Sequence, residues 1–224
     1  MIRKEDNCMT PGFIVFEGLD GAGKTTQIRL LAAALEQRGH KVAVSTEPTE
    51  YESGRALRAA LSGSVRKTPA EMAVMFTADR IAHNQNEESG IERLLRDGYT
   101  VISDRYYYSS LAYQGSVTDP AWVAHLNLDC PEIRKPDLCV FLDLSPEISM
   151  KRITENRSSG EREIYETLDQ LTRIRKTFLD VFAMLTETED EARRENVVFV
   201  DASGTIEEVA QSVLSAVLGE ETTA

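Results

Sequence analysis

The chain has 224 residues, of which 42% are apolar and 28% are charged, and its formal net charge is −12. This apolar fraction supports a sizeable core, which excludes a disordered or collagen-like chain. The longest uninterrupted apolar run, Leu30–Leu35, has six residues, whereas a membrane-spanning helix needs about 20. The acidic balance argues against a nucleic-acid groove, which requires a basic face. We therefore expect a soluble protein that binds neither membranes nor nucleic acid.

The chain is predicted to form one domain over residues 12–218, with residues 1–11 as an N-terminal extension and residues 219–224 as an acidic C-terminal tail. Its three cysteines are Cys8, Cys130 and Cys139. They show no CxxC spacing, so we expect neither a disulfide scaffold nor a zinc site, and a reducing cytoplasm is the natural compartment.

Short apolar runs bounded by turn residues predict five buried parallel strands. In chain order these are Phe13–Phe16, Lys41–Ser45, Tyr99–Ser103, Leu138–Leu142 and Val197–Val200. Helical patterns separate the runs, and strands that alternate with helices indicate right-handed crossovers. The predicted fold class is therefore α/β, a five-stranded parallel sheet with helices on both faces.

Three helices have clear signatures. The first is predicted from Lys24 to Arg38 with a C-terminal cap at Gly39, and the last over Thr205–Leu218. A long helix is predicted from apolar residues three or four positions apart, namely Ile164, Leu168, Leu171, Ile174, Phe178, Phe182 and Leu185. The polar segment at residues 156–163 precedes it and is interpreted as a mobile lid.

The strongest motif runs from Gly18 to Thr25 and fits GxxxxGK[ST], between a predicted strand and a predicted helix. Its glycines let backbone N–H groups converge on phosphate oxygens, and the helix N-terminus adds its dipole. Lys24 can reach the β- and γ-phosphates, and the Thr25 hydroxyl can ligate Mg²⁺. The motif predicts binding of a nucleoside triphosphate through Gly18, Asp20, Gly21, Ala22, Gly23, Lys24, Thr25 and Thr26.

A second signal is the apolar strand that ends in Asp104-Arg105. Asp104 is expected at the carboxyl edge of the sheet, where open α/β sheets bind ligands, and could hold Mg²⁺ together with Thr25. The alternative is that Asp104 caps the following helix. The absence of a guanine-recognition motif disfavours a GTPase, and the short, acidic chain disfavours a motor. Arg80 and Arg105 instead indicate a second, anionic pocket.

Six segments together resemble the thymidylate kinases, which are P-loop nucleoside-monophosphate kinases, over about residues 12–218. These segments are FEGLDGAGKTT (Phe16–Thr26), TEPT (Thr46–Thr49), FTADR (Phe76–Arg80), DRYYYSSLAYQG (Asp104–Gly115), FLDLSPE (Phe141–Glu147) and the Arg-bearing loop before Tyr165. The resemblance implies a P-loop NTPase fold, transfer of a phosphoryl group from Mg-ATP to dTMP, and a homodimer.

The resemblance also implies roles for acceptor-site residues. Phe76 would stack on thymine, Arg80 would bind the carbonyl edge of the base, and Arg105 would bind the dTMP phosphate, with Arg55 as a weaker candidate. The residues taken alone leave alternatives open: Phe76 lies in a helical Met/Phe stripe that is typical of core packing, and Arg80 could form a surface ion pair with Asp79.

Further implied roles concern the sugar, the acceptor phosphate and adenine. Ser110 and Gln114 lie where the family reads the base, and Tyr113 where it packs against deoxyribose. Asp20 resembles the carboxylate near the acceptor sugar and phosphate. Arg152 and residues 201–203 resemble the adenine-side contacts.

Charge neutralisation, rather than a strong base, is the expected catalytic requirement, because the attacking phosphate is already largely ionised. The expected catalytic residues are Lys24 and Asp20 of the glycine-rich motif and Arg105 of the Asp104-Arg105 pair. Since the P-loop carries Gly21 where some relatives carry arginine, a lid arginine should supply the missing cation, either Arg157 or Arg162. A deoxynucleoside kinase and a non-catalytic nucleotide-binding module remain the alternative functions.

Overall fold

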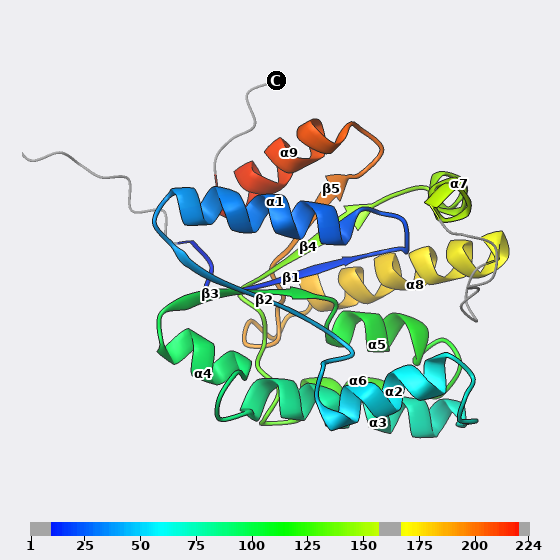
Figure 1. Cartoon of the computed structure of the whole chain (residues 1–224). Helices are drawn as coiled ribbons and strands as arrows, with labels where there is room; N and C mark the ends of the chain where they lie inside the picture. The colour runs from blue at the N-terminus through cyan, green and yellow to red at the C-terminus, as the bar shows by residue number, and fades with distance from the viewer. Residues whose placement is uncertain (1–9, 157–166, 220–224) are drawn as a thin grey trace, which may run out of the picture.

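The computed structural model of the protein describes residues 10–156 and 167–219. Within these ranges, five parallel strands form one sheet in the order β2-β3-β1-β4-β5 (Figure 1). The strands are β1 (Phe13–Gly18), β2 (Lys41–Thr46), β3 (Tyr99–Asp104), β4 (Leu138–Asp143) and β5 (Val197–Asp201). All five predicted strands are confirmed, and each extends one or two residues beyond its predicted carboxyl end.

Helices connect the strands, as parallel pairing requires. They are α1 (Lys24–Gln37), α2 (Glu52–Leu61), α3 (Pro69–Gln85), α4 (Ile91–Arg96), α5 (Tyr107–Tyr113), α6 (Pro120–Leu128), α7 (Pro146–Asn156), α8 (Leu168–Thr186) and α9 (Ile206–Leu218). In Figure 1, α1 and α9 cover one face of the sheet, whereas α5 and α8 lie on the other, with α2, α3 and α6 beyond α5. The predicted α/β fold is confirmed.

Alternating residues of β1 divide the core between these two faces, as the two-residue period of a strand requires. Phe13 and Val15 pack in the cluster that contains α5 and α8, and Ile14 and Phe16 pack in the cluster that contains α1 and α9. Because β1 is central and buried on both faces, the loop that follows it starts from a rigid support.

The predicted helix ends agree closely with the observed ones. Helix α1 ends at Gln37, and Gly39 follows in the left-handed region with φ 88°. Helix α8 buries the predicted apolar face, but Leu168 is 42% exposed because it opens the helix. Ile164 and the part of the predicted lid beyond Asn156 lie outside the described residues.

Among the helices in the described ranges, none is both long enough and apolar enough to cross a membrane. Cys139 is buried in β4 and Cys130 is partly exposed, and both are free thiols. Cys8 lies outside the described residues.

Candidate active site at the carboxyl edge of the sheet

The glycine-rich loop joins β1 to α1 in the predicted context. Gly18, Gly21 and Gly23 have φ values of 147°, 78° and 91°, which glycine adopts without the penalty that a side chain would add. At Gly18, a β-carbon would lie 2.7 Å from the carbonyl oxygen of Leu142 in β4. The loop can therefore follow this path only because position 18 has no side chain.

Lys24 is the first residue of α1, and its side chain folds back over the loop. Its Nζ donates to the carbonyl oxygens of Gly18 at 3.0 Å and Leu19 at 3.1 Å, and lies 4.0 Å from the Asp20 carboxylate. Burial lowers the pKa of the Lys24 ammonium. A phosphate group beside Nζ would restore a favourable partner for this buried cation.

A cavity of about 330 Å³ opens over the loop. Its lining consists of Asp20, Gly21, Gly23, Lys24, Thr25, Thr26, Thr46, Glu47, Asp104 and Arg105. Eight of these residues are predicted site residues, and they come from two chain segments about 80 residues apart. Gly18 and Ala22, the other two predicted residues of this segment, are buried and do not line the cavity.

Thr25 and Asp104 meet at one side of this cavity. The Thr25 hydroxyl donates to Asp104 Oδ2 at 3.1 Å, since the register that pairs Phe16 with Asp104 brings the ends of β1 and β3 together. Within the described ranges, no group of three or more acidic, histidine or cysteine side chains could hold a metal by itself. These two oxygens therefore fit Mg²⁺ that takes its other ligands from nucleotide phosphates and water.

Asp104 does not cap the following helix, contrary to the alternative raised by the sequence. The N-terminal N–H groups of α5 instead bind Glu17 of β1: Glu17 Oε1 accepts from the backbone N–H groups of Tyr106 at 2.9 Å and Ser109 at 3.0 Å. Asp104 is thus left facing Thr25 and the cavity.

Arg105 follows β3 and reaches toward the P-loop. Its guanidinium forms an ion pair with Asp20, donates to Ser109 Oγ at 3.0 Å, and lies 5.5 Å from the centre of the Tyr113 ring. Burial raises the pKa of the Tyr113 hydroxyl. The structure thus brings together three predicted acceptor-site residues, Asp20, Arg105 and Tyr113.

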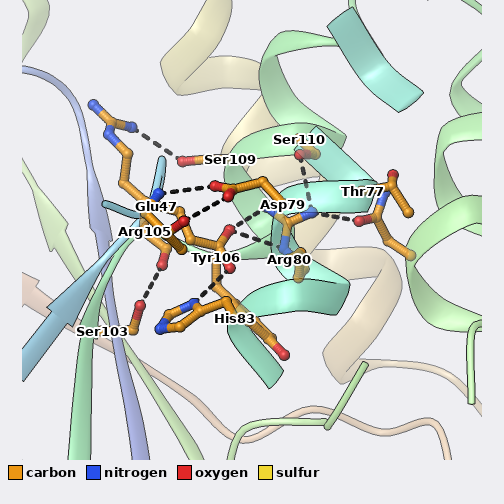
Figure 2. Close-up of polar contacts among 12 residues, drawn as sticks. Glu47, Thr77, Asp79, Arg80, His83, Ser103, Arg105, Tyr106, Ser109 and Ser110 are labelled. Carbon is orange, nitrogen blue, oxygen red and sulfur yellow. Dashed lines mark hydrogen bonds and ion pairs between the residues drawn. The ribbon is translucent and has the colours of Figure 1, made fainter. Parts of the chain in front are cut away.

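Arg80 of α3 is buried, with 1% of its surface exposed. Its Nε and Nη2 donate to Glu47 Oε2 at 3.0 and 2.6 Å, and its Nη1 donates to Ser110 Oγ at 3.2 Å and to Asn127 Oδ1. Glu47 Oε1 lies 3.0 Å from His83 Nδ1, so Glu47 sits between Arg80 and His83 (Figure 2). Glu47 also lines the cavity, which places this cluster beside the P-loop.

The surface ion pair suggested for Arg80 and Asp79 is wrong. Asp79 is buried and instead accepts from the backbone N–H of Thr49 at 2.8 Å, from the Thr49 hydroxyl and from the Ser53 hydroxyl. Asp79 thereby ties α3 to the segment between β2 and α2, and the same segment carries Glu47.

The remaining predicted acceptor residues differ in how far their side chains are exposed. Phe76 lies one helical turn before Arg80 on the same side of α3, is partly exposed, and belongs to neither apolar cluster of the described chain. That position fits a ligand contact better than the core-packing alternative. Gln114 is buried at the end of α5, whereas Arg55 is exposed and donates to the Glu50 carbonyl.

Arg152 of α7 approaches the P-loop, with its Nη1 3.5 Å from the carbonyl oxygen of Gly21. Asp201 ends β5, and its side chain accepts from the backbone N–H of Ser203. The two predicted lid arginines, Arg157 and Arg162, lie outside the described residues.

Sequence reasoning missed Glu17 and Glu47 as parts of the site. Glu17 is the penultimate residue of β1 and Glu47 directly follows β2, and both are buried carboxylates. For Glu17, a charged residue inside an apolar strand was the available signal, since such a residue is rarely buried without a partner; Glu47 lies outside its strand and gave no such signal. The partners of both carboxylates, however, lie 33 or more residues away and are fixed only by the fold.

Comparison with known proteins agrees with this site. The thymidylate kinase family model matches residues 16–213. A probable thymidylate kinase of Archaeoglobus fulgidus is 36% identical over 201 residues, which cover 89% of this chain and 91% of that protein. One from Pyrobaculum aerophilum is 38% identical, covering 90% and 93%, and a thymidylate kinase of Leptospira borgpetersenii serovar Hardjo-bovis is 37% identical, covering 75% and 80%. The chain belongs to the thymidylate kinase family.

Proposed function

We propose that the chain transfers the γ-phosphoryl group of ATP, with Mg²⁺, to the phosphate of dTMP, releasing dTDP and ADP. The observation that supports this proposal is one cavity that joins the P-loop to Arg105 and to Glu47, the partner of Arg80. A triphosphate on the loop and a monophosphate at Arg105 would then face each other across Asp20.

The reaction forms a bond between a dTMP phosphate oxygen and the γ-phosphorus and breaks the bond from that phosphorus to the β,γ-bridging oxygen. The attacking oxygen needs no strong base, because the second pKa of a phosphate monoester is about 6. Catalysis then depends on aligning two polyanions and neutralising their charge.

Lys24 is the cation for the triphosphate in this proposal, and Arg105 is the cation for the acceptor phosphate. Asp20 pairs with Arg105 and lies 4.0 Å from Lys24, so it orients both cations toward the space between the two nucleotides. Arg157 or Arg162 would add positive charge from the lid, where an arginine used in this way is worth roughly 10³–10⁵ in rate.

Thr25 and Asp104 would hold Mg²⁺ through their facing oxygens. When bound, the ion neutralises charge on the phosphate oxygens. Both residues also line the cavity beside Lys24. The ion that they would hold and the Lys24 ammonium would therefore lie around the same phosphate chain.

The acceptor base would lie against α3 and α5. Phe76 would stack on thymine and Arg80 would bind its carbonyl edge, while Ser110, which accepts from Arg80 at 3.2 Å, and Gln114 would complete the base contacts. Tyr113 would pack against deoxyribose. Arg55, which is exposed, is the weakest member of this set.

The adenine end of ATP would lie near α7 and the end of β5, with Arg152 as its contact beside Gly21. The family resemblance further supports a homodimer, and the spacing of the three cysteines supports a location in the reducing cytoplasm. Sedimentation equilibrium tests the dimer: we expect twice the mass of one chain, and a single-chain mass at micromolar concentration would contradict it.

The activity is tested by measuring ADP formation from Mg-ATP with dTMP, dUMP, UMP, CMP, AMP and thymidine offered separately. We expect the fastest turnover with dTMP and negligible turnover with thymidine, because thymidine lacks the phosphate that Arg105 would bind. Turnover with thymidine would indicate a deoxynucleoside kinase. No turnover with any acceptor would indicate a nucleotide-binding module that does not transfer phosphate.

A further inference from the structure

Arg105 adopts an unusual backbone conformation. Its φ is 71°, and among the residues that the structure describes it is the only non-glycine residue with a positive φ. The left-handed region costs a residue with a side chain roughly 1–2 kcal/mol, so the surrounding structure must hold it there. This bend turns the chain from the end of β3 into α5 and gives the guanidinium its direction toward the P-loop.

Hydrogen bonds fix the bend on both sides. The Arg105 N–H donates to the Phe16 carbonyl at 2.9 Å, and the Arg105 carbonyl accepts from Ser103 Oγ at 2.8 Å. The next N–H, that of Tyr106, donates to the Glu17 carboxylate at 2.9 Å. Two adjacent residues of β1, Phe16 and Glu17, therefore hold the peptide groups at both ends of Arg105.

Glu17 also reaches the Arg105 side chain through one intermediate. Glu17 Oε2 accepts from the Ser109 hydroxyl at 2.8 Å. The same Ser109 Oγ accepts from Arg105 Nη1 at 3.0 Å, a bond that Figure 2 shows. With its single hydrogen directed to Glu17, the hydroxyl presents its lone pairs to the guanidinium. The carboxylate thus sets the direction of a hydrogen-bond chain that ends on Arg105.

A carboxylate in this place is costly. Glu17 is fully buried, and burial raises its pKa above the usual value. A serine or aspartate at the start of α5 would satisfy the same helix N–H groups at a lower desolvation cost. Glu17 differs from such a cap because it also fixes the bend at Arg105 and the orientation of Ser109.

We propose that Glu17 is a positioning residue for phosphoryl transfer: it acts through Ser109 and the left-handed turn to hold the Arg105 guanidinium where the acceptor phosphate binds. This inference rests on the proposed function, in which Arg105 contacts the dTMP phosphate. Glu17 itself touches no substrate and takes no proton from one.

The test measures the dissociation constants of dTMP and of thymidine by calorimetry for the wild type and for Glu17→Gln, Ser109→Ala and Arg105→Met. The ratio of the two constants isolates the contribution of the phosphate. In Glu17→Gln, the amide would present an N–H to Ser109 Oγ in competition with Arg105. We expect the phosphate contribution to fall about tenfold in Glu17→Gln and Ser109→Ala and at least as far in Arg105→Met, with thymidine affinity nearly unchanged.

Tyr107→Phe is the matched control. Tyr107 lies in the same helix and donates its hydroxyl to Glu195 at 2.7 Å, away from Arg105, so its loss should lower stability and leave the ratio unchanged. If Glu17→Gln does not fold, Ser109→Ala alone carries the test, because it removes the hydroxyl that links Glu17 to Arg105 and keeps the bonds from the backbone N–H groups of Tyr106 and Ser109 to Glu17.

The outcomes separate the two claims. A wild type that binds dTMP no better than thymidine would contradict the proposed function and this inference with it. A wild type that prefers dTMP and an Arg105→Met variant that has lost the preference would support the function. If Glu17→Gln and Ser109→Ala then keep the full preference, or lose thymidine affinity equally, Glu17 has only a structural role and the inference is overturned.

Discussion

Glu17 and Glu47 are buried carboxylates, and each is linked to one arginine of the site. Glu47 bonds to Arg80 directly, and Glu17 is linked to Arg105 through Ser109. Burying an ion costs several kcal/mol, and this cost is offset only where hydrogen bonds and an opposite charge are well placed. Glu47 meets this condition with two bonds to Arg80 and a contact to His83. Glu17 meets it with two backbone N–H groups and a hydroxyl, and the positive charge of Arg105 counteracts the rise in the Glu17 pKa that burial causes.

Loss of the Glu47 carboxylate should destabilise the protein strongly. In Glu47→Gln, Arg80 keeps its charge in a buried site without its counter-ion, and we expect the free energy of unfolding to fall by about 3–5 kcal/mol. Urea unfolding measures this change. Glu50→Gln is the control, because Glu50 pairs with Arg58 at 2.9 Å but is 83% exposed, and its loss should cost less than about 1 kcal/mol. Equal effects of the two substitutions would contradict the account of Arg80.

Lys24 supplies positive charge that no neighbouring side chain of the loop can replace. We expect Lys24→Met to lower kcat about 10²–10³-fold, as loss of one group that stabilises transition-state charge typically does. Steady-state kinetics with Mg-ATP and dTMP measure the change. Lys41→Met is the control, since Lys41 is exposed at the start of β2 and should change kcat by no more than about twofold. A Lys24→Met variant with unchanged turnover would disprove the mechanism.

At the scale of elements, the turn from β1 into α1 depends on Gly18. In Gly18→Ala, the alanine would have to adopt the positive φ of Gly18, and its β-carbon would lie 2.7 Å from the carbonyl oxygen of Leu142. We expect the free energy of unfolding to fall by about 2–5 kcal/mol, of which about 1–2 kcal/mol comes from the conformation and the rest from the clash. Gly63→Ala should show the conformational part alone: its φ is 77°, and no heavy atom of the described chain outside its own neighbours lies within 4 Å. Equal losses in the two variants would contradict the packing argument.

The start of α3 makes a pH-dependent contribution to stability. Thr68 and Glu71 form a capping box, and the hydrogen bond from the Thr68 backbone N–H, followed by that from Lys67, lowers the pKa of Glu71 from 4.5 to about 2. A carboxyl group whose pKa is lower in the folded state adds stability above pH 4.5 and loses it as the pH falls toward about 2. Glu71→Gln should therefore flatten the fall in unfolding free energy over this range.

Thermal unfolding of the wild type and of Glu71→Gln at several pH values between 3 and 6, chosen to span roughly this titration, measures the difference. We expect a gap that narrows as the pH falls. A gap that stays constant with pH would show that the Glu71 charge contributes nothing to the cap.

The P-loop and the strands could be predicted because their signals are local. The eight residues from Gly18 to Thr25 form one contiguous motif, and each strand is a short apolar run bounded by turn residues. The bonds of Arg80 could not be predicted in the same way. Its partners Glu47, Ser110 and Asn127 lie 33, 30 and 47 residues away, and only the packing of α3 against the sheet edge, α5 and α6 selects them over the adjacent Asp79.

At the scale of the whole molecule, the site exists because parallel strands end at one edge. The register of β1 with β3 brings the loop after Phe16 beside Asp104, and the order β2-β3-β1 brings Glu47 to the same edge. The central position of β1 makes this edge rigid, since both of its faces are covered. The proposed acceptor and donor sites are therefore neighbours as a consequence of topology.

The most direct test of the central claim is to follow the label from ATP carrying ³²P in the γ-phosphate, with Mg²⁺ and dTMP present, and to separate the products by chromatography. We predict label in dTDP for the wild type, and almost none for Lys24→Met or when thymidine replaces dTMP. Label released as inorganic phosphate, with none in dTDP, would show that the chain hydrolyses ATP instead and would contradict phosphoryl transfer to dTMP.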